Sequence, residues 1–497
     1  MYKLFLSLSI ALYTLNAYSQ EKKLVDENHI LNKALQDFKN DTDLKNASIG
    51  FLAIDSKTGE TIGKLNPDLS LMPASTQKIV TTAAALEVLG KNFRYRTSLQ
   101  YSGTIDPIHK CLNGDIYIKG GADPTLGSEY FDKERSYFFI RNWVSKIREK
   151  HIDTVKGCVI GDASVYGTEI TPPKWLWEDV GNYYGSGANG LTAFDNLYRI
   201  YFISPAKADL LTTITKVEPE IPGLILHNEV LSSNVGSDEA FVFGAPYSYV
   251  QYLRGTIPKN RSEFSIKGAI PDPAYYLAWY FEQELKNAGI VVKGEATTDR
   301  ILKISGDSMN YERKDLDVYF SPPLSTIIDV TNKKSINLFA EHMFNEIANK
   351  ISNNGTNSAA IKAVTDFWES KGMDIKGFYI CDGSGLSRFD AITPRQLVFV
   401  LQYMMNKSKN FQEFYESLPV AGESGTLKSI GKNTSAKSVV VAKSGSIGRV
   451  RAYAGYVTTK SGRSLVFSMN IANYNCSSSE ARKKLTNLMV AMADFDL

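Results

Sequence analysis

Apolar residues near the N-terminus follow patterns that predict regular structure. They alternate over residues 47–54, and Lys57–Gly59 provides a turn, so we expect a β-hairpin there. The hairpin leads into an alanine-rich apolar run over residues 75–90. This run predicts a helix that begins near Ser75.

A second set of patterns lies toward the C-terminus. Residues 335–351 place apolar side chains on one stripe, which predicts a helix. A tight turn is expected at Lys460–Gly462, between two strands. The strands of this predicted antiparallel sheet are residues 438–446, 450–459 and 464–473.

The closing segment, residues 481–495, predicts a basic amphipathic helix. Docking on a membrane is one use for such a helix. Packing on the C-terminal sheet is the interpretation we favour.

The middle of the chain, about residues 96–310, differs from both ends. It is rich in glycine, proline and short strand-like segments, and it has no internal repeat and no low-complexity tract. We interpret it as inserted β-rich material.

The composition is that of an ordinary globular protein. Of 497 residues, 43% are hydrophobic and 22% are charged, and the length favours two or three domains. The net charge of +3 is too small to indicate a nucleic-acid partner.

The first residues have the layout of a secretory signal peptide. Lys3 precedes an apolar core over residues 4–15, and small residues follow at Ala17 and Ser19. The core is short for a membrane span of about 20 residues. We therefore expect residues 1–19 to be removed and the protein to be exported to the periplasm, with a membrane anchor as the alternative.

Two kinds of site are not supported. The spacing of the four cysteines, Cys111, Cys158, Cys381 and Cys476, fits no metal motif. Export permits a Cys111–Cys158 disulfide, and buried free thiols are equally consistent. Residues 185–190 match G-x-G-x-x-G, but no buried strand precedes them, so we expect no dinucleotide. No metal or organic cofactor is implied.

The chemistry centres on Ser75 and Lys78, which lie one helical turn apart and share a helix face. A helix N-terminus stabilises a developing negative charge. A serine hydroxyl becomes a strong nucleophile only when a base takes its proton, and a lysine is such a base only when its pKa is lowered. A second match, Ser429 to Lys432, has no helical run behind it.

Two further motifs follow in order. Ser335-Ile336-Asn337 opens the second predicted helix, and Lys443-Ser444-Gly445 leaves a strong strand. The order Ser-x-x-Lys, Ser-x-Asn, Lys-[Ser/Thr]-Gly is that of penicillin-binding proteins and class A β-lactamases. The other Lys-[Ser/Thr]-Gly matches lie before Ser75 or in the predicted turn after residue 459.

The chain resembles the serine-type D-Ala-D-Ala carboxypeptidases of low-molecular-mass class C, the penicillin-binding-protein 4 type of peptidase family S13. The resemblance rests on "LMPASTQKIVTTAAALEVLG", "GADPTLGS", "WLWEDV", "CDGSGLSRFD", "LPVAGESGTL" and "AKSGSIGRVRAYAGYVTTKSG". Ser444 stands where threonine is usual, and Ile336 stands where aspartate is common.

The resemblance implies an α/β (α+β) fold. A penicillin-binding, β-lactamase-like domain would be formed from residues 23–95 and 311–497, and the β-rich inserts would occupy residues 96–310. The long interval from Ser75 to Ser335 is similar to the spacing that these inserts give the family.

The resemblance also implies roles for the motif residues. Ser75 would be the acylated nucleophile and Lys78 its base. Lys443 would carry a second positive charge that lowers the pKa of Lys78 and attracts the substrate carboxylate. Ser335 would relay a proton to the leaving amine. Asn337 would hydrogen-bond the peptide or Lys78.

Further residues would bind the substrate. Ser444 and Gly445 would face the terminal carboxylate. The backbone N–H groups of Ser75 and Ser446 would form an oxyanion hole. Arg388 is a candidate for the rim of the cleft, with a structural ion pair as the alternative.

The resemblance places Asp179, in "WLWEDV", opposite the ammonium group of the stem peptide's diamino acid, and a solvated surface acid is the alternative. We interpret Trp175 and Trp177 in the same segment as packing residues rather than sugar platforms.

The implied activity is hydrolysis of D-Ala-D-Ala ends of peptidoglycan stem peptides, and of D-Ala–diamino-acid cross-links, through an acyl-enzyme. β-Lactams would acylate the same serine, and peripheral membrane or cell-wall association is possible. The alternatives are a β-lactamase or esterase on the same residues, and a non-catalytic cell-wall-binding protein.

Overall fold

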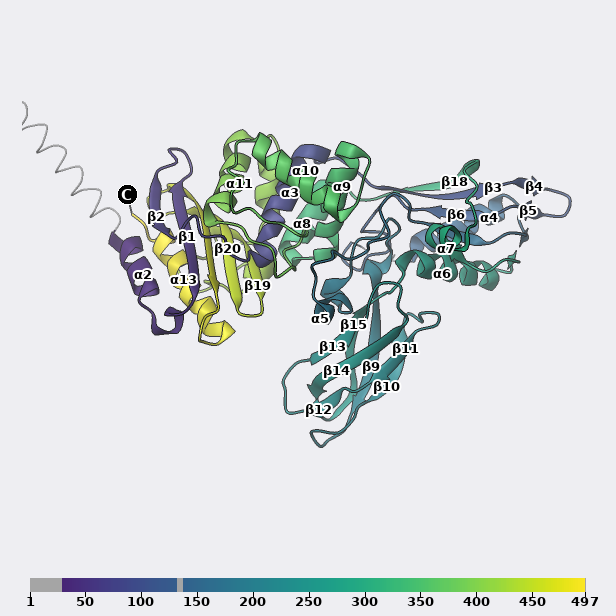
Figure 1. Ribbon diagram of the computed structural model, residues 1–497, viewed down its shortest axis with the longest axis horizontal. Coiled ribbons are helices and arrows are strands. Elements are labelled where there is room, and N and C mark those ends of the chain that lie inside the picture. The colour runs from purple at the N-terminus through teal and green to yellow at the C-terminus, as the bar shows by residue number, and fades with distance from the viewer. Residues whose placement is uncertain (1–28, 132–136, 497) are drawn as a thin grey trace, which may run out of the picture.

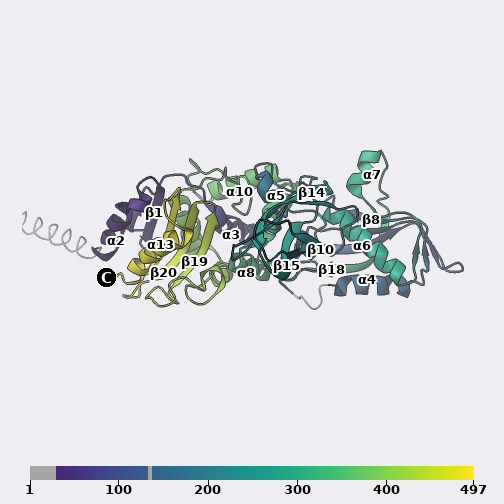
Figure 2. The ribbon, with the colours of Figure 1, turned by 90° about the horizontal axis from the view of Figure 1, so that it is seen from below.

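The computed structural model describes residues 29–131 and 137–496. The predicted signal peptide, residues 1–19, lies outside the described residues. The described chain is elongated, with one α/β unit at one end and two inserted units toward the other (Figures 1 and 2).

The first unit is built on a five-stranded sheet of order β19-β20-β21-β1-β2, and every neighbouring pair is antiparallel. Strand β1 pairs along its whole length with β21, so segments from both ends of the chain share one sheet. The predicted hairpins are confirmed. The strands are β1 (Ser48–Asp55), β2 (Thr61–Leu65), β19 (Val440–Ile447), β20 (Val450–Thr458) and β21 (Ser464–Ala472).

Helices cover both faces of this sheet (Figure 1). On one face, α2 (His29–Lys39) and α13 (Ser478–Ala493) pack on apolar residues that include Phe51 and Phe467. The closing helix therefore packs on the sheet, as the favoured interpretation predicted. The other face carries α3 (Lys78–Leu89), α8 (Leu324–Lys334), α9 (Asn337–Ser352), α10 (Asn357–Ser370), α11 (Pro394–Lys407) and α12 (Phe411–Ser417).

Helix α3 is the central element of that second face. Its first nine residues, Lys78–Leu86, are all buried, which explains why its sequence is apolar without a polar stripe. The indole of Trp368 on α10 donates to the carbonyl of Val80 at 3.3 Å, so α3 is also fixed by a buried polar contact.

The second unit begins where β3 leaves the first unit and ends with β18, which pairs antiparallel with β3. Its larger sheet has the order β17-β8-β6-β3-β18. Its strands are β3 (Arg96–Ser102), β6 (Ile116–Lys119), β8 (Val159–Asp162), β17 (Thr297–Thr298) and β18 (Arg313–Phe320).

A smaller sheet, β16-β7-β5-β4, completes this unit with three helices. The elements are β4 (Thr104–Asp106), β5 (Cys111–Asn113), β7 (Thr154–Val155), β16 (Val291–Val292), α4 (Phe138–Glu149), α6 (Pro273–Asn287) and α7 (Asp299–Ser305).

The third unit is a small β-sandwich within the second. One sheet has the order β10-β9-β15, the other β11-β14-β12 with β13 paired to β14, and Phe202 and Leu253 pack between them. The strands are β9 (Leu197–Ser204), β10 (Thr213–Glu218), β11 (Ile225–Asn228), β12 (Leu231–Ser233), β13 (Glu239–Phe243), β14 (Val250–Pro258) and β15 (Arg261–Ala269).

All four cysteines are free thiols, so the possible Cys111–Cys158 disulfide is not formed. The amide and thiol of Cys158 face a carboxylate oxygen of Asp115 instead, at 3.0 and 3.5 Å. Burial is the main reason that the pKa of the Cys158 thiol rises to about 12. None of the helices in residues 29–131 and 137–496 has both the length and the apolar character needed to cross a membrane.

Candidate active site

Ser75 lies on a tight turn that the helix pattern did not resolve. The sequence predicts a helix that begins near Ser75, but in the structure the helix begins at Lys78. Residues Ala74–Gln77 form one 3₁₀ turn before it. Ala74 has a positive φ of 46°, a conformation that non-glycine residues rarely adopt. The hydroxyl of Thr76 donates to the Pro73 carbonyl at 2.6 Å and braces the turn. Such local strain is typical of functional sites.

The amine of Lys78 joins Ser75 to two distant segments. It is fully buried, and its Nζ lies 3.1 Å from Ser75 Oγ. It also lies 2.6 Å from Asn337 Oδ1 and 2.8 Å from the carbonyl oxygen of Ser384. The distance to Ser75 is suitable for direct proton transfer between hydroxyl and amine.

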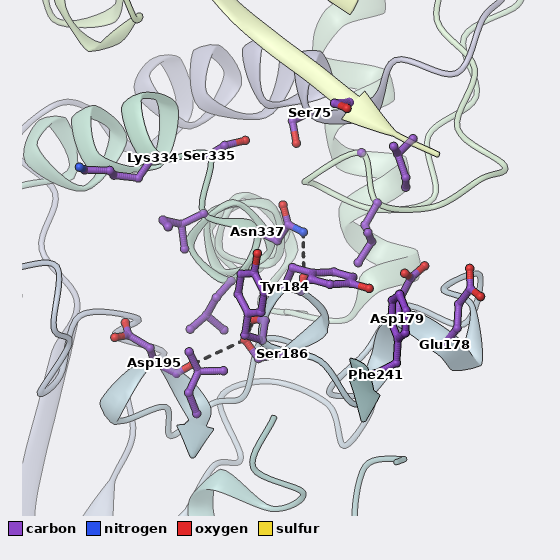
Figure 3. A pocket seen from close by; sticks show the side chains of 18 of the residues that line it. Ser75, Glu178, Asp179, Tyr184, Ser186, Asp195, Phe241, Lys334, Ser335 and Asn337 are labelled. Atoms are coloured by element: carbon purple, nitrogen blue, oxygen red, sulfur yellow. Dashed lines mark hydrogen bonds between the residues drawn. The ribbon is translucent and has the colours of Figure 1, made fainter. Parts of the chain in front are cut away.

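The Ser-x-Asn motif lies at the junction of α8 and α9. Ser335 ends α8 with a positive φ of 60°, and Asn337 begins α9. Lys443 Nζ donates to Ser335 Oγ at 2.9 Å, and Asn337 Nδ2 donates to the Tyr184 carbonyl at 2.8 Å. This junction therefore connects the amine of Lys443, the amine of Lys78 and a loop of the inserted region. Figure 3 shows the contact between Asn337 and Tyr184.

Strand β19 forms another wall of the site. It is the edge strand of its sheet, and the N–H of Ala442 points off that edge to the Pro419 carbonyl at 2.9 Å. Because N–H directions repeat every second residue in a strand, the N–H of Ser446 also points off the free edge. The hydroxyl of Ser444 donates to Thr426 Oγ1 at 2.7 Å.

The motif glycine is required by packing. A Cβ on Gly445 would lie 2.6 Å from the Pro73 carbonyl oxygen and 3.1 Å from the Ser75 nitrogen. Glycine lets β19 approach the backbone of the Ser75 turn, which brings Ser446 and Ser75 onto the same cavity.

The loop Asp382–Gly385 supplies a contact that the motifs did not reveal. Gly385 has a φ of 80°, and a Cβ there would lie 2.0 Å from the Ala74 carbonyl oxygen. The carboxylate of Asp382 accepts from the backbone N–H groups of Ser384, Gly385 and Ser387 at 2.6–3.1 Å. It therefore holds the loop in the shape that points the Ser384 carbonyl at Lys78.

Burial sets the pKa of both lysines. It lowers the pKa of Lys78 to about 8, although nearby carboxylates, Asp382 first, oppose the change. It lowers the pKa of Lys443 well below 10.5, and the charge of Lys78 lowers it further. We expected the charge of Lys443 to depress the pKa of Lys78. Desolvation alone lowers the pKa of Lys78, and the charges that act on it are those of nearby carboxylates, which raise it.

These groups open onto a cavity of about 600 Å³ between the first unit and the inserted units. Figure 3 shows Ser75, Ser335 and Asn337 on one side and the inserted residues Tyr184 and Asp179 on the other. Lys78 and Lys443 lie beneath the surface with no exposed area. The cavity is lined by residues that include Ser75, Asp179, Ser335, Asn337, Arg388 and Ser446.

Asp179 lies on the short helix α5 (Trp177–Val180) and faces this cavity. It is 4% exposed, and its Oδ2 has no hydrogen-bond partner among the described residues. Burial raises the pKa of its carboxyl group, while the charge of Arg388 and a hydrogen bond from the side chain of Tyr184 lower it. Asp179 is therefore not a solvated surface acid, and the buried oxygen without a partner is a costly feature of the site.

Arg388 borders the same cavity, and its Nη2 lies 3.7 Å from Glu178 Oε1. It is thus both a rim residue and one partner of a loose ion pair. Glu178 and Tyr184 were not singled out from the sequence. Their only signal was proximity to Asp179 along the chain.

The second Ser-x-x-Lys match does not reach the site, whereas the glycine-rich segment over residues 185–190 lines the cavity only through Ser186. Ser429 and Lys432, the second Ser-x-x-Lys match, are both exposed and do not line the cavity. The glycine-rich segment near residue 185 packs against backbone, and a Cβ on Gly185 would lie 1.9 Å from the Asp179 carbonyl oxygen. Among the residues with described positions, no group of three or more metal-binding side chains is arranged to hold an ion.

Comparison with known proteins agrees with this architecture. A D-alanyl-D-alanine carboxypeptidase of Actinomadura sp. (strain R39) is 28% identical over 445 residues, which is 86% of this chain and 78% of that protein. The crystal structure of penicillin binding protein 4 from Haemophilus influenzae matches with a TM-score of 0.79 and 21% identity, covering 94% of this chain and 99% of that one.

A second structure of the H. influenzae protein, complexed with a β-lactam, has a TM-score of 0.74 and 20% identity. It covers 92% of this chain and 97% of that one. These likenesses confirm the fold class expected from the sequence.

The family model of the D-Ala-D-Ala carboxypeptidase 3 (S13) family matches residues 31–495, almost the whole chain. With its strained serine turn, buried lysine and three converging motifs, the chain belongs to the D-Ala-D-Ala carboxypeptidase 3 (S13) family.

Proposed function

We propose that this protein is a serine D-Ala-D-Ala carboxypeptidase that removes the terminal D-alanine of peptidoglycan stem peptides through an acyl-enzyme on Ser75. The observation that carries the proposal is the buried amine of Lys78, 3.1 Å from the hydroxyl of Ser75. Only the neutral amine accepts a proton, and burial favours the neutral form.

Acylation begins when Lys78 takes the proton of Ser75 and Oγ attacks the carbonyl carbon of the penultimate D-alanine. The N–H groups of Ser75 and Ser446 stabilise the oxyanion. The intermediate collapses by breaking the C–N bond. The proton that Lys78 took from Ser75 returns by way of Ser335 to the leaving D-alanine amine, so Lys78 is neutral again. A water molecule then attacks the acyl-enzyme, with Lys78 again as base.

Lys443, Ser444 and Gly445 receive the terminal carboxylate of the substrate. A carboxylate near Lys443 raises the pKa of its amine, because the opposite charge favours the ammonium form. Once Lys443 is charged, its repulsion lowers the pKa of Lys78. Substrate binding thus moves the proton to Lys443, where the carboxylate needs it, and leaves Lys78 free to act as base.

Asp179 pairs with the ammonium group of the diamino acid in the stem peptide, and Arg388 lies on the rim beside it. The support is the buried Oδ2, which faces the cavity without a partner. A charge-assisted hydrogen bond from an ammonium group would satisfy it.

The same geometry suits two related reactions. D-Ala–diamino-acid cross-links present the same carbonyl and give endopeptidase activity. β-Lactams acylate Ser75 and inhibit the enzyme. The proposal includes export to the periplasm by residues 1–19, and peripheral contact with the cell wall or membrane.

Replacement of the nucleophile tests the proposal. Ser75→Ala should abolish covalent labelling by fluorescent penicillin, while Ser429→Ala should label at the wild-type rate. Gel fluorescence after incubation with the probe measures both, and circular dichroism confirms folding. Labelling that persists in Ser75→Ala and is lost in Ser429→Ala would contradict the assignment. Rapid nitrocefin turnover by the wild type without a stable label would favour a β-lactamase.

The pKa of Lys78 predicts a pH dependence of acylation. The free base is active, so the second-order rate constant for penicillin acylation should rise about tenfold per pH unit and level off above the pKa of about 8. Stopped-flow measurements between pH 5.5 and 9.5 on the free enzyme report this value. A rate that is constant below pH 8, or that falls as pH rises, would exclude Lys78 as the base.

Asp179→Asn should lower kcat/KM for a stem peptide with a free side-chain amine by about 10- to 100-fold, since a desolvated charge pair is lost. When the side-chain amine of the peptide is acetylated, Asp179→Asn and the wild-type enzyme should cleave it at the same rate. Glu178→Gln is the matched control, because Glu178 is 53% exposed and should have a smaller effect. An equal loss on both peptides would assign Asp179 a structural role.

A further inference from the structure

A row of exposed and half-buried rings crosses the outer face of the β-sandwich. In β14, Val250, Tyr252 and Arg254 face solvent, while Gln251 and Leu253 between them are buried. The outward residues therefore belong to one face of the sheet. A water-exposed face normally carries polar side chains at such positions, so exposed aromatic rings require an explanation.

The register aligns these rings in order. Tyr252 lies between His227 on β11 and Phe243 on β13. The His227 and Tyr252 rings stack with centroids 4.9 Å apart, and the guanidinium of Arg254 lies 5.6 Å from the Tyr252 ring and 5.7 Å from Phe243. Aromatic and cation–π contacts of this kind hold the side chains in fixed positions.

Trp177 extends the row to the active-site cavity. Its ring lies 5.0 Å from Phe243, and it is 58% exposed, so the expectation that Trp177 is a packing residue is wrong. Trp175 is buried, and its indole donates to Asp382 at 2.7 Å, as a packing residue should be placed.

The row ends at residues that line the cavity itself. Trp177 begins α5, which also carries Glu178 and Asp179. Phe241, two residues before Phe243 on β13, is 38% exposed and borders the cavity beside Asp179 (Figure 3). The exposed surface is therefore continuous with the site of chemistry. We call the row His227, Tyr252, Phe243 and Trp177 the aromatic strip.

We propose that the aromatic strip binds the glycan strand of peptidoglycan and so guides the attached stem peptide into the cavity. This inference rests on the proposed function, because it takes the polymer that bears the stem peptide as the ligand. Nothing in the catalytic steps requires these four rings.

The chemistry of the strip fits a polysaccharide. Sugar rings have apolar C–H faces that pack on aromatic rings and hydroxyl edges that need hydrogen-bond partners. The strip offers flat rings, and Arg254 and Glu229 lie along it as a 3.0 Å ion pair. An anionic membrane or a nucleic acid would favour a basic surface, whereas Glu229 and Glu239 lie on this face.

The location also fits the length of the substrate. A stem peptide of about five residues spans at most about 18 Å when fully extended. With its D-Ala-D-Ala end at Ser75, the glycan must pass close to the rim of the cavity. The aromatic strip begins at that rim, at Trp177.

Binding to peptide-free glycan strands tests the inference without catalysis. The full-length chain carrying Ser75→Ala is titrated with purified strands, alone and with Trp177→Ala or Tyr252→Thr added. Threonine keeps the strand propensity of position 252. Each added change should weaken binding about three- to tenfold, the loss of one aromatic contact. Tyr311→Thr, which removes a 77% exposed ring off the strip, should change nothing.

A second measurement separates binding from folding. Here Trp177→Ala and Tyr252→Thr are introduced into the otherwise wild-type protein, which keeps Ser75. Both variants should label with penicillin and cleave a free stem peptide at wild-type rates. They should lose activity only on substrate that still carries the glycan strand. Equal glycan binding by all variants, or no binding by any, would overturn the inference. Slower penicillin labelling in the strip variants would overturn it as well, because the changes would then act on the active site rather than on glycan binding. If the wild-type protein is not labelled by penicillin, the proposed function is refuted. The glycan titration does not depend on that result, so the two failures can be told apart.

Discussion

The buried amine of Lys78 is the constraint on which the rest of the site depends. An ammonium group without water or a partner is costly in an interior, so the protein must supply acceptors for it and tolerate its neutral form. Three segments distant in sequence do so: the Ser75 turn, Asn337 at the start of α9, and the Ser384 carbonyl. The strain at Ala74, the glycine at 385 and the buried Asp382 all serve this arrangement.

The inserted units contribute to the same site rather than to a separate one. A loop from the insert accepts the hydrogen bond of Asn337 through the Tyr184 carbonyl, and α5 brings Asp179 to the cavity. Glycines such as Gly185 let this loop fold closely on α5. The first unit thus supplies the reactive groups, and the insert supplies the opposite wall, where substrate selection and contact with the polymer would occur.

The sequence predicts the residues that belong to short motifs and the elements that follow a hydrophobic period. It does not predict features that depend on how distant segments pack together. Motif order identified Ser75, Lys78 and Lys443, and periodicity placed α9, the hairpins and the packing of α13. The Ser384 carbonyl was missed because any residue has a carbonyl, and only the loop's shape aims it at Lys78. The cause of the lowered Lys78 pKa was misjudged because desolvation and surrounding carboxylates depend on packing. The exposure of Trp177 could not be predicted either, because it depends on the packing of α5 against β13.

The most direct test of the account is a titration of the Lys78 amine itself. Nuclear magnetic resonance of the protein with ¹⁵N-labelled lysine side chains, assigned by comparison with Lys78→Arg, follows the protonation of this one group. The account predicts a midpoint near pH 8. An amine that titrates near the ordinary lysine value of 10.5 would mean that Ser75 faces an ammonium group throughout the working range, and the account would be contradicted.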